Sequence, residues 1–236
     1  SDVDSGLDAK VTLSTSLNLD LTINPDFSQV EVDQQSTNLD RFELFFPEKR
    51  QFFLENSDLF ASLGSKNIRP FFSRRIGLAT PVKGGARLSG KLGSNYRLGI
   101  MSMQTDANEE NPASNFTVAT LQRKILTRSS LSIFLVNKES DLQENANGSE
   151  NSYNRVGGID FNLASADNLW TGKTFFHQAI YKNAGYNAFA AATSIKYNTG
   201  TVSAHMGYSF VGTDFEADVG FVKRTGFHRF GPHLEY

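Results

Sequence analysis

The chain has 236 residues, enough for one large all-β unit or two small domains. Its formal net charge of −2 gives no reason to expect nucleic acid as a partner. Cys is absent, which excludes disulfides, thiolate metal sites and cysteine nucleophiles. A mean hydropathy of −0.34 and the lack of an apolar run of about 18 residues exclude a transmembrane helix. Membrane-spanning strands remain open, because each needs only about 9–11 residues with every second one apolar.

Residues 11–23 show a period of two. The apolar residues fall on odd positions, and Thr, Ser, Asn and Asp fill the even ones. A helix, with its period of about 3.6, cannot place these apolar residues on one face, whereas a strand can. The pattern therefore predicts β-structure with one apolar face.

Residues 38–75 break this pattern. Phe pairs alternate with clusters of both charge signs, and neither period fits. One interpretation is a plug, a segment folded inside the lumen of a β-barrel, whose charges pair with one another or with the wall. The other is a periplasmic turn followed by ordinary strands with an aromatic rim. The charge cluster of the plug interpretation comprises Arg41, Glu43, Glu48, Lys49, Arg50, Glu55, Arg74 and Arg75.

Three strand pairs are predicted in the middle of the chain. They are residues 86–93 with 96–104, residues 116–125 with 131–138, and residues 155–164 with 169–181. In residues 131–136 both faces carry apolar groups, so the alternation there is less clean. With the other segments, we expect roughly twelve to fourteen strands, by counting period-two runs.

A long hairpin is predicted near the end of the chain. Residues 189–197 and 202–210 alternate, and residues 198–200 form the turn. Each arm has roughly ten residues, the length that a tilted strand needs to cross a bilayer. The residues expected to face lipid are Phe189, Ile195, Tyr197, Val202, Met206, Tyr208 and Phe210.

The predicted connections alternate in length. Short turns at 94–95, 127–130, 165–168 and 198–200 alternate with long polar connections at 106–114 and 139–154. Outer-membrane barrels place short turns on one rim and long loops on the other. Aromatic residues near the predicted strand ends are candidates for interfacial girdles: Tyr96, Phe116, Trp170, Tyr181, Tyr186 and Tyr197. These observations favour an all-β, antiparallel transmembrane β-barrel that occupies residues 1–236 as a single domain.

Residues 24–31 and 38–55 resemble a family of bacterial outer-membrane β-barrels that is described as a domain of unknown function, and residues 70–77 and 85–91 continue the resemblance. Members of that family often carry a domain similar to family 9 carbohydrate-binding modules ahead of the barrel. The resemblance is specific over about residues 6–105 and implies a barrel with more strands than this chain. We therefore expect a partial barrel. The start of the chain also lacks a basic region followed by an apolar core, so a mature or partial product is expected.

The chemistry-bearing residues give no strong site. His228 and His233 are five positions apart near Asp214, Glu216 and Asp218, but an odd separation places the two His on opposite faces of a strand. Paired carboxylates for glycoside hydrolysis are conceivable in a polar lumen, but no two of them stand out. The sequence therefore predicts no catalytic residue, no metal site and no cofactor.

The function expected from these patterns is a non-enzymatic protein of the Gram-negative outer membrane. Its partners would be the lipid bilayer and other outer-membrane or periplasmic proteins, in envelope transport or as a subunit or client of an outer-membrane assembly. One alternative is a glycan-binding or glycan-processing protein, which rests on the module that often precedes such barrels and is missing from this chain. Another is a soluble all-β binding module.

Overall fold

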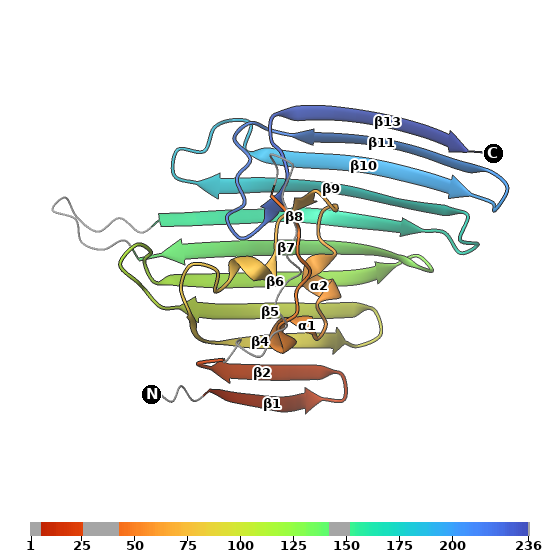
Figure 1. Ribbon diagram of the computed structural model, residues 1–236. Helices are drawn as coiled ribbons and strands as arrows, with labels where there is room; N and C mark the ends of the chain where they lie inside the picture. Colours follow the sequence, from red (N-terminus) through yellow and green to blue (C-terminus); the bar gives the residue numbers. More distant parts are fainter. Residues whose placement is uncertain (1–5, 26–42, 142–151, 236) are drawn as a thin grey trace.

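The computed structural model describes residues 6–25, 43–141 and 152–235, and its regular structure is almost entirely antiparallel strand (Figure 1). Eleven strands form one sheet in the order β1-β2-β4-β5-β6-β7-β8-β9-β10-β11-β13. Their bounds are β1 (Leu7–Ser14), β2 (Leu17–Ile23), β4 (Val82–Leu92), β5 (Tyr96–Thr105), β6 (Ser114–Ile125), β7 (Ser129–Ser140), β8 (Ser152–Ala164), β9 (Trp170–Tyr181), β10 (Phe189–Asn198), β11 (Ser203–Val211) and β13 (Phe227–Glu235). The prediction of an all-β, antiparallel fold is confirmed. The sheet is open, with β1 and β13 as its edge strands in the described part of the chain.

The remaining elements are short. They are α1 (Gln51–Leu54), α2 (Asp58–Ala61), β3 (Ile68–Arg69), the 3-10 turn η1 (Ser73–Arg75) and β12 (Phe221–Val222). Strands β3 and β12 pair with each other and form a separate two-stranded sheet. Figure 1 shows α1 and α2 lying in front of one face of the large sheet.

The alternating run at residues 11–23 is two strands, not one. Strand β1 ends at Ser14, β2 begins at Leu17, and the two pair as a hairpin with a bulge between Thr12 and Ser14. The bulge inserts one extra residue, so the apolar side chains remain on odd positions through the turn. The turn between β1 and β2 therefore does not interrupt the alternation of apolar and polar residues in the sequence.

The connections sort by length between the two ends of the sheet. Residues 15–16, 93–95, 126–128, 165–169 and 199–202 form short turns at one end, which is on the right in Figure 1. The longer connections 24–81, 106–113, 141–151, 182–188 and 212–226 leave the opposite end. Such sorting follows when each strand pairs with its neighbour in the chain, because every second connection then falls at the same end.

The two faces of the sheet differ in what covers them. We call the face under residues 43–81 the inner face, and those residues the inner segment. Phe53, Leu59 and Phe60 of the inner segment are buried against side chains such as Met101 and Val118 of the inner face, and they belong to one apolar core. The opposite face, the outer face, is covered by nothing in the described residues.

Strand β7 explains why both of its faces looked apolar in the sequence. Phe134 and Val136 point to the inner face and are buried, with exposed fractions of 7% and 2%. Leu131, Ile133 and Leu135 point to the outer face, and Ile133 is 50% exposed. A strand between a protein core and an uncovered apolar face needs apolar residues on both sides.

A glycine on the inner face lets the inner segment approach the sheet closely. A Cβ built on Gly99 would lie 2.7 Å from Cζ of Phe60. A larger residue at this position would force the Phe60 ring away from the strand. Across residues 6–25, 43–141 and 152–235, no helix is long and apolar enough to cross a membrane.

Candidate functional site: the inner layer and its anchors

The inner segment is joined by a second stretch from the other end of the chain. Residues 212–226, which we call the return loop, carry β12, and Phe221 and Val222 pair with Arg69 and Ile68 of β3. The amide of Phe72 donates to the carbonyl oxygen of Val219 at 2.7 Å. The inner segment and the return loop together form the inner layer, so the first and last parts of the described chain meet on one face of the sheet.

Arg50 and Glu48 hold the middle of the inner segment together. Arg50 Nη2 donates to Oε2 of Glu48 at 2.7 Å and to the carbonyl of Ser73 at 2.7 Å, and the Ser73 hydroxyl donates to the same carboxylate at 2.6 Å. Arg50 Nη1 also donates to the carbonyl of Ile76 at 2.6 Å. Burial alone would raise the pKa of Glu48, but the hydrogen bonds and charge of Arg50 outweigh it and lower that pKa. The carboxylate thus stays ionised and ties α1 to η1.

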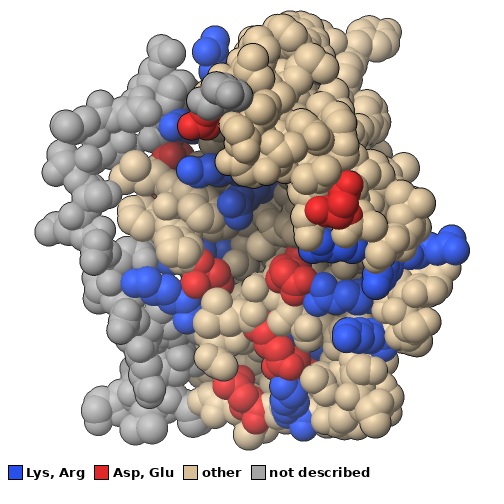
Figure 2. All heavy atoms as spheres, turned by 90° about the vertical axis from the view of Figure 1, so that its right-hand side faces the viewer, with Lys and Arg blue, Asp and Glu red and all other residues tan. Residues whose placement is uncertain are grey.

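A second group of charges anchors the inner segment to the first strands. Arg87 of β4 is buried, with an exposed fraction of 2%, and donates to Oδ2 of Asp20 at 2.8 Å and to the carbonyl of Phe52. Lys10 of β1 pairs with Glu55, whose carboxylate lies 2.5 Å from the ammonium. Figure 2 looks onto the short-turn end and shows Lys and Arg side chains next to Asp and Glu in its lower half, over the strands nearest β1. These pairs clamp the end of α1 to the sheet.

A third anchor is the buried pair of Asp160 and His177. Asp160 Oδ1 lies 2.7 Å from Nε2 of His177, and Oδ2 accepts from the amide of Gly64 at 2.6 Å and lies 3.2 Å from Nζ of Lys173. His177 is fully buried and stacks on Phe175 with 4.5 Å between ring centroids. Lys173 also donates to the carbonyl of Ser62. Strands β8 and β9 thus hold the turn that follows α2 through its backbone.

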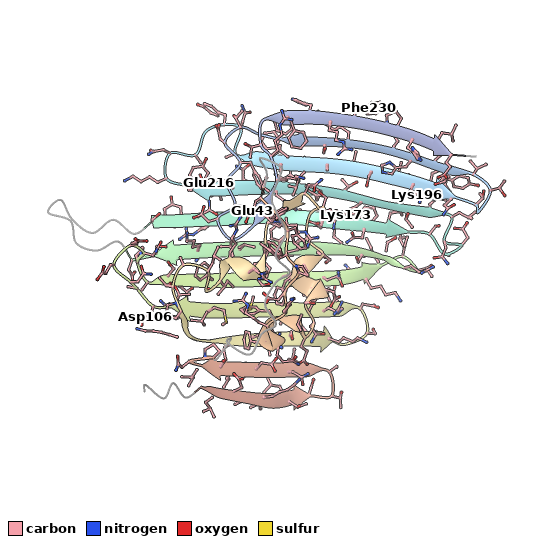
Figure 3. The ribbon with its side chains drawn as sticks, viewed as in Figure 1. Glu43, Asp106, Lys173, Lys196, Glu216 and Phe230 are labelled. Atoms are coloured by element: carbon pink, nitrogen blue, oxygen red, sulfur yellow. The ribbon has the colours of Figure 1, made fainter. Side chains whose placement is uncertain are left out.

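The return loop has its own anchors on the sheet. Lys138 of β7 lies 3.0 Å from Oδ2 of Asp218, and Asn154 of β8 donates to the carbonyl of Glu216 at 3.1 Å. Burial raises the pKa of Glu216, and the neighbouring charge of Asp218 raises it further. Figure 3 shows Glu216 towards the end with the long connections and Lys173 towards the opposite end. The inner layer is therefore fixed to the sheet at several separate places.

The predicted charge cluster separates into several groups. Arg50 pairs with Glu48, Arg75 Nη2 lies 2.5 Å from Glu43, and Arg74 donates to the carbonyl of Pro47 at 2.8 Å. Glu55 pairs with strand residues instead. Lys49 lies beside Glu48 with its amide donating to that carboxylate at 3.0 Å, and Arg41 and the rest of residues 38–42 lie outside the described residues. Within residues 43–81, these charges pair with one another, with backbone groups and with the sheet, and β3 is the only strand that the structure describes there. The plug interpretation of residues 38–75 stays a prediction.

The residues expected to face lipid lie mostly on one face of the sheet. Phe189, Ile195 and Tyr197 of β10 share the outer face with Met206, Tyr208 and Phe210 of β11, because each group alternates and the register pairs Ile195 with Met206 and Thr193 with Tyr208. Val202 is an exception, since it lies in the turn before β11 and accepts through its carbonyl from the amide of Thr199.

Two of the aromatic residues assigned to strand-end girdles are placed differently. Phe116 points to the inner face and belongs to the core, with an exposed fraction of 7%. The Tyr181 hydroxyl donates to the carbonyl of Asp214 in the return loop at 2.7 Å. A position near a strand end does not determine which face a side chain occupies. Because side chains alternate between the two faces along a strand, both of these residues lie on the inner face.

The histidines do not converge. His228 lies on the outer face with Nδ1 2.6 Å from the Tyr208 hydroxyl, whereas His233 is paired with His205 on the opposite face of β13. In the part of the chain that the structure describes, no group of three or more His, Asp or Glu side chains could hold a metal ion. The anchors described above hold charges and backbone groups in fixed positions.

Sequence reasoning missed the anchors contributed by the strands, such as Asp20, Arg87, Asp160 and His177. A signal was present in the predicted strand of residues 169–181, because His177 lies between Phe175 and Ala179 on one face of that strand. Polar groups on a face that becomes buried are expected to have partners. Asp160 and His177 become neighbours only in the register of β8 with β9, and that register depends on the length of the turn between these strands.

Residues 1–92 match a family model described as a domain of unknown function, DUF5916. The matched stretch contains β1, β2, the inner segment and β4, which is the part held together by Arg87, Asp20, Glu55 and Lys10. Comparisons with curated proteins and with solved structures gave no match.

Proposed function

We propose that this chain is part of a non-enzymatic β-barrel in the outer membrane of a Gram-negative bacterium. The protein acts in envelope transport, or as a subunit or client of a larger outer-membrane assembly. The hydrocarbon of the bilayer solvates the outer face, and the inner face bounds a lumen that the inner layer fills. Further strands or contact between the edge strands close the barrel, since lipid cannot satisfy open backbone groups.

The observation that carries the proposal is the uncovered apolar outer face. Ile133 is 50% exposed, Ile159 52%, Phe176 49% and Ile180 52%, and all of them lie on the face opposite the inner layer. Proteins in water rarely expose a continuous apolar surface larger than a few hundred Å², by order of magnitude. A sheet with a packed core on one side and apolar side chains on the other suits a boundary between protein and lipid.

The ends of the outer face support this assignment. At the short-turn end, Trp170 and Tyr197 pack with 4.7 Å between ring centroids, and the guanidinium of Arg123 lies over the ring of Tyr96. At the opposite end, Asn137 accepts from Arg155 at 2.8 Å, and Arg155 pairs with Glu139. Aromatic and charged residues flanking an apolar band are typical of the membrane–water interface.

The anchors of the inner layer support a plug role for residues 38–75. Several buried or partly buried ion pairs and hydrogen bonds hold a segment in one place, whereas a mobile gate would need fewer of them. The inner segment is joined to β1 and β2 through Glu55 and to β4 through Asn56, and backbone groups of Ser62 and Gly64 join it to β9 and β8. We therefore place it as a fixed part of the lumen wall rather than as a moving lid.

Extraction of the native protein from cell envelopes tests the location. The expected result is retention in the outer-membrane fraction after salt and carbonate washes and release by detergent. A protein released without detergent cannot be embedded through its outer face, and the proposal would be wrong.

Size exclusion of the detergent-solubilised native protein then tests the assembly version. Co-elution with other outer-membrane or periplasmic chains, identified by mass spectrometry, is the expected result for a subunit or client. Elution as a monomer without other chains would contradict the role in an assembly and would be compatible with the role in transport.

A further inference from the structure

An apolar pocket lies between the inner segment and the sheet. Its volume is about 230 Å³, and its walls are mostly apolar, with five phenylalanines from the inner segment and Met101 from β5. The phenylalanines are Phe45, Phe53, Phe60, Phe71 and Phe72. An engineered apolar cavity of about 150 Å³ stays dry and binds benzene, so walls of this kind favour an apolar occupant over water.

One cation lines this pocket without a carboxylate partner. Arg69 lies on β3, whose pairing with β12 fixes its backbone, and its guanidinium stacks over Phe45 at 4.3 Å from the ring centroid. Its Nε is buried and has no hydrogen-bond partner. Burial lowers the pKa of Arg69, and no acidic group offsets that effect.

Arg69 differs in this respect from the arginines around it. Arg50 pairs with Glu48, Arg75 with Glu43, and Arg87 with Asp20. The other two charged side chains of the pocket wall are Glu48 and Arg87, and both are engaged in these pairs. The wall is therefore left with one positive charge beside aromatic rings. A buried polar atom without a partner, such as Nε of this partly buried guanidinium, is costly and calls for an explanation in a native structure.

We propose that this pocket binds a small organic anion, a monocarboxylate whose apolar body is about the size of a benzene ring or slightly larger. The carboxylate pairs with the guanidinium of Arg69, and the body packs among the phenylalanine rings. A planar guanidinium suits a carboxylate because it can donate two parallel hydrogen bonds. The inference rests on the inner layer and the strands β4 and β5 beneath it, and not on the proposed membrane location.

The test measures binding of 3-phenylpropionate and of its neutral analogue 3-phenylpropanol to the folded chain in detergent, by calorimetry or ligand-observed NMR. The wild-type chain is expected to bind the acid about tenfold more tightly than the alcohol, the ratio that one charge-assisted hydrogen bond provides. In Arg69→Gln the affinity for the acid falls to that for the alcohol, while the affinity for the alcohol stays the same. Lys66→Gln, a neighbouring exposed cation outside the pocket, is the matched control and changes neither affinity.

A second variant and a stability measurement guard against misfolding. Ala61 lines the pocket at the end of α2, and Ala61→Phe should fill it and abolish binding of both ligands. Arg69→Gln should unfold at the same or a higher denaturant concentration than wild type without ligand, because it removes a partly buried charge that has no carboxylate partner. The inference is overturned if wild type binds neither ligand, or if Arg69→Gln retains the preference for the acid. Neither result bears on the extraction experiment, so the two proposals fail separately.

Discussion

Among single residues, Asp160 of β8 joins strand β9 to the inner segment. Its two oxygens serve His177, Lys173 and the amide of Gly64, and its side chain is 1% exposed. Gly64 adopts a φ of +70°, and a Cβ there would lie 2.0 Å from the carbonyl oxygen of Ile68. The turn that brings this amide to Asp160 is thus open only to glycine.

Replacing Asp160 by Ala should destabilise the protein strongly. His177 and Lys173 would lose their carboxylate in a buried place, and breaking such a pair costs about 3–5 kcal/mol. Urea unfolding in detergent measures the change. Asp141→Ala, at an exposed carboxylate after β7, is the control and should change the free energy of unfolding by less than about 0.5 kcal/mol. Equal effects of both variants would show that Asp160 is not an anchor.

Glu48 predicts a pH dependence for the inner segment. Its pKa lies below the ordinary value of 4.5, so its contribution to docking is complete above that pH and is lost as the pH falls through the lower, folded-state pKa. Glu48→Gln lacks the charge at every pH. Hydrogen exchange of residues 43–81 should therefore show weaker protection in the variant at neutral pH, and the difference from wild type should shrink below pH 4.5. A constant difference down to pH 2 would contradict the pairing of Glu48 with Arg50.

Among the elements, those of the inner segment were the hardest to predict. Helices α1 and α2 have four residues each, which is little more than one turn, so no apolar period can develop. Strand β3 has two residues and pairs with β12, which lies about 150 positions further along the chain and is fixed by tertiary contacts. The long strands, in contrast, carry their own pattern, and every predicted central pair is present as a neighbouring pair in the sheet.

A cross-link can test the pairing of β3 with β12. The chain has no Cys, so the double variant Ile68→Cys/Val222→Cys contains only the two thiols of the tested pair. Mild oxidation should form an intramolecular disulfide, because directly opposed residues of antiparallel strands bring their Cβ atoms close enough. Non-reducing electrophoresis detects the product. The control pair Asp8→Cys/Val222→Cys joins β1 to β12, which are separated across the sheet in Figure 1, and should stay reduced. Equal yields for both pairs would argue against the register.

For the molecule as a whole, substitutions on the outer face can distinguish a membrane protein from a soluble one. Ile133→Arg places a charge in the middle of the apolar band and should destabilise the protein folded in a bilayer by about 2–4 kcal/mol. Leu92→Arg, on the same face at the end of β4 with a 41% exposed side chain, should cost about 0–1 kcal/mol. Folding yield into lipid vesicles measures both. A soluble module would tolerate the two charges equally well, since both positions are exposed.

The order of apolar and polar residues was enough to predict the antiparallel all-β fold, the sorting of short turns and long connections, and which residues of the long strands share a face. Period two is a local property of an extended chain, so it can be read without knowing what covers each face. It was ambiguous where a bulge kept the parity through a turn, as between Thr12 and Ser14.

What covers each face of the sheet, and which polar groups contact each other, became known only from the three-dimensional structure. Phe116 and Ile133 are both apolar strand residues, yet one is buried under the inner layer and the other is half exposed. Nothing in the sequence pattern distinguishes Arg69 from the other arginines. The fold places its guanidinium beside phenylalanine rings and without a carboxylate partner. Such pairings depend on register and on contacts between distant segments, and no local period encodes them.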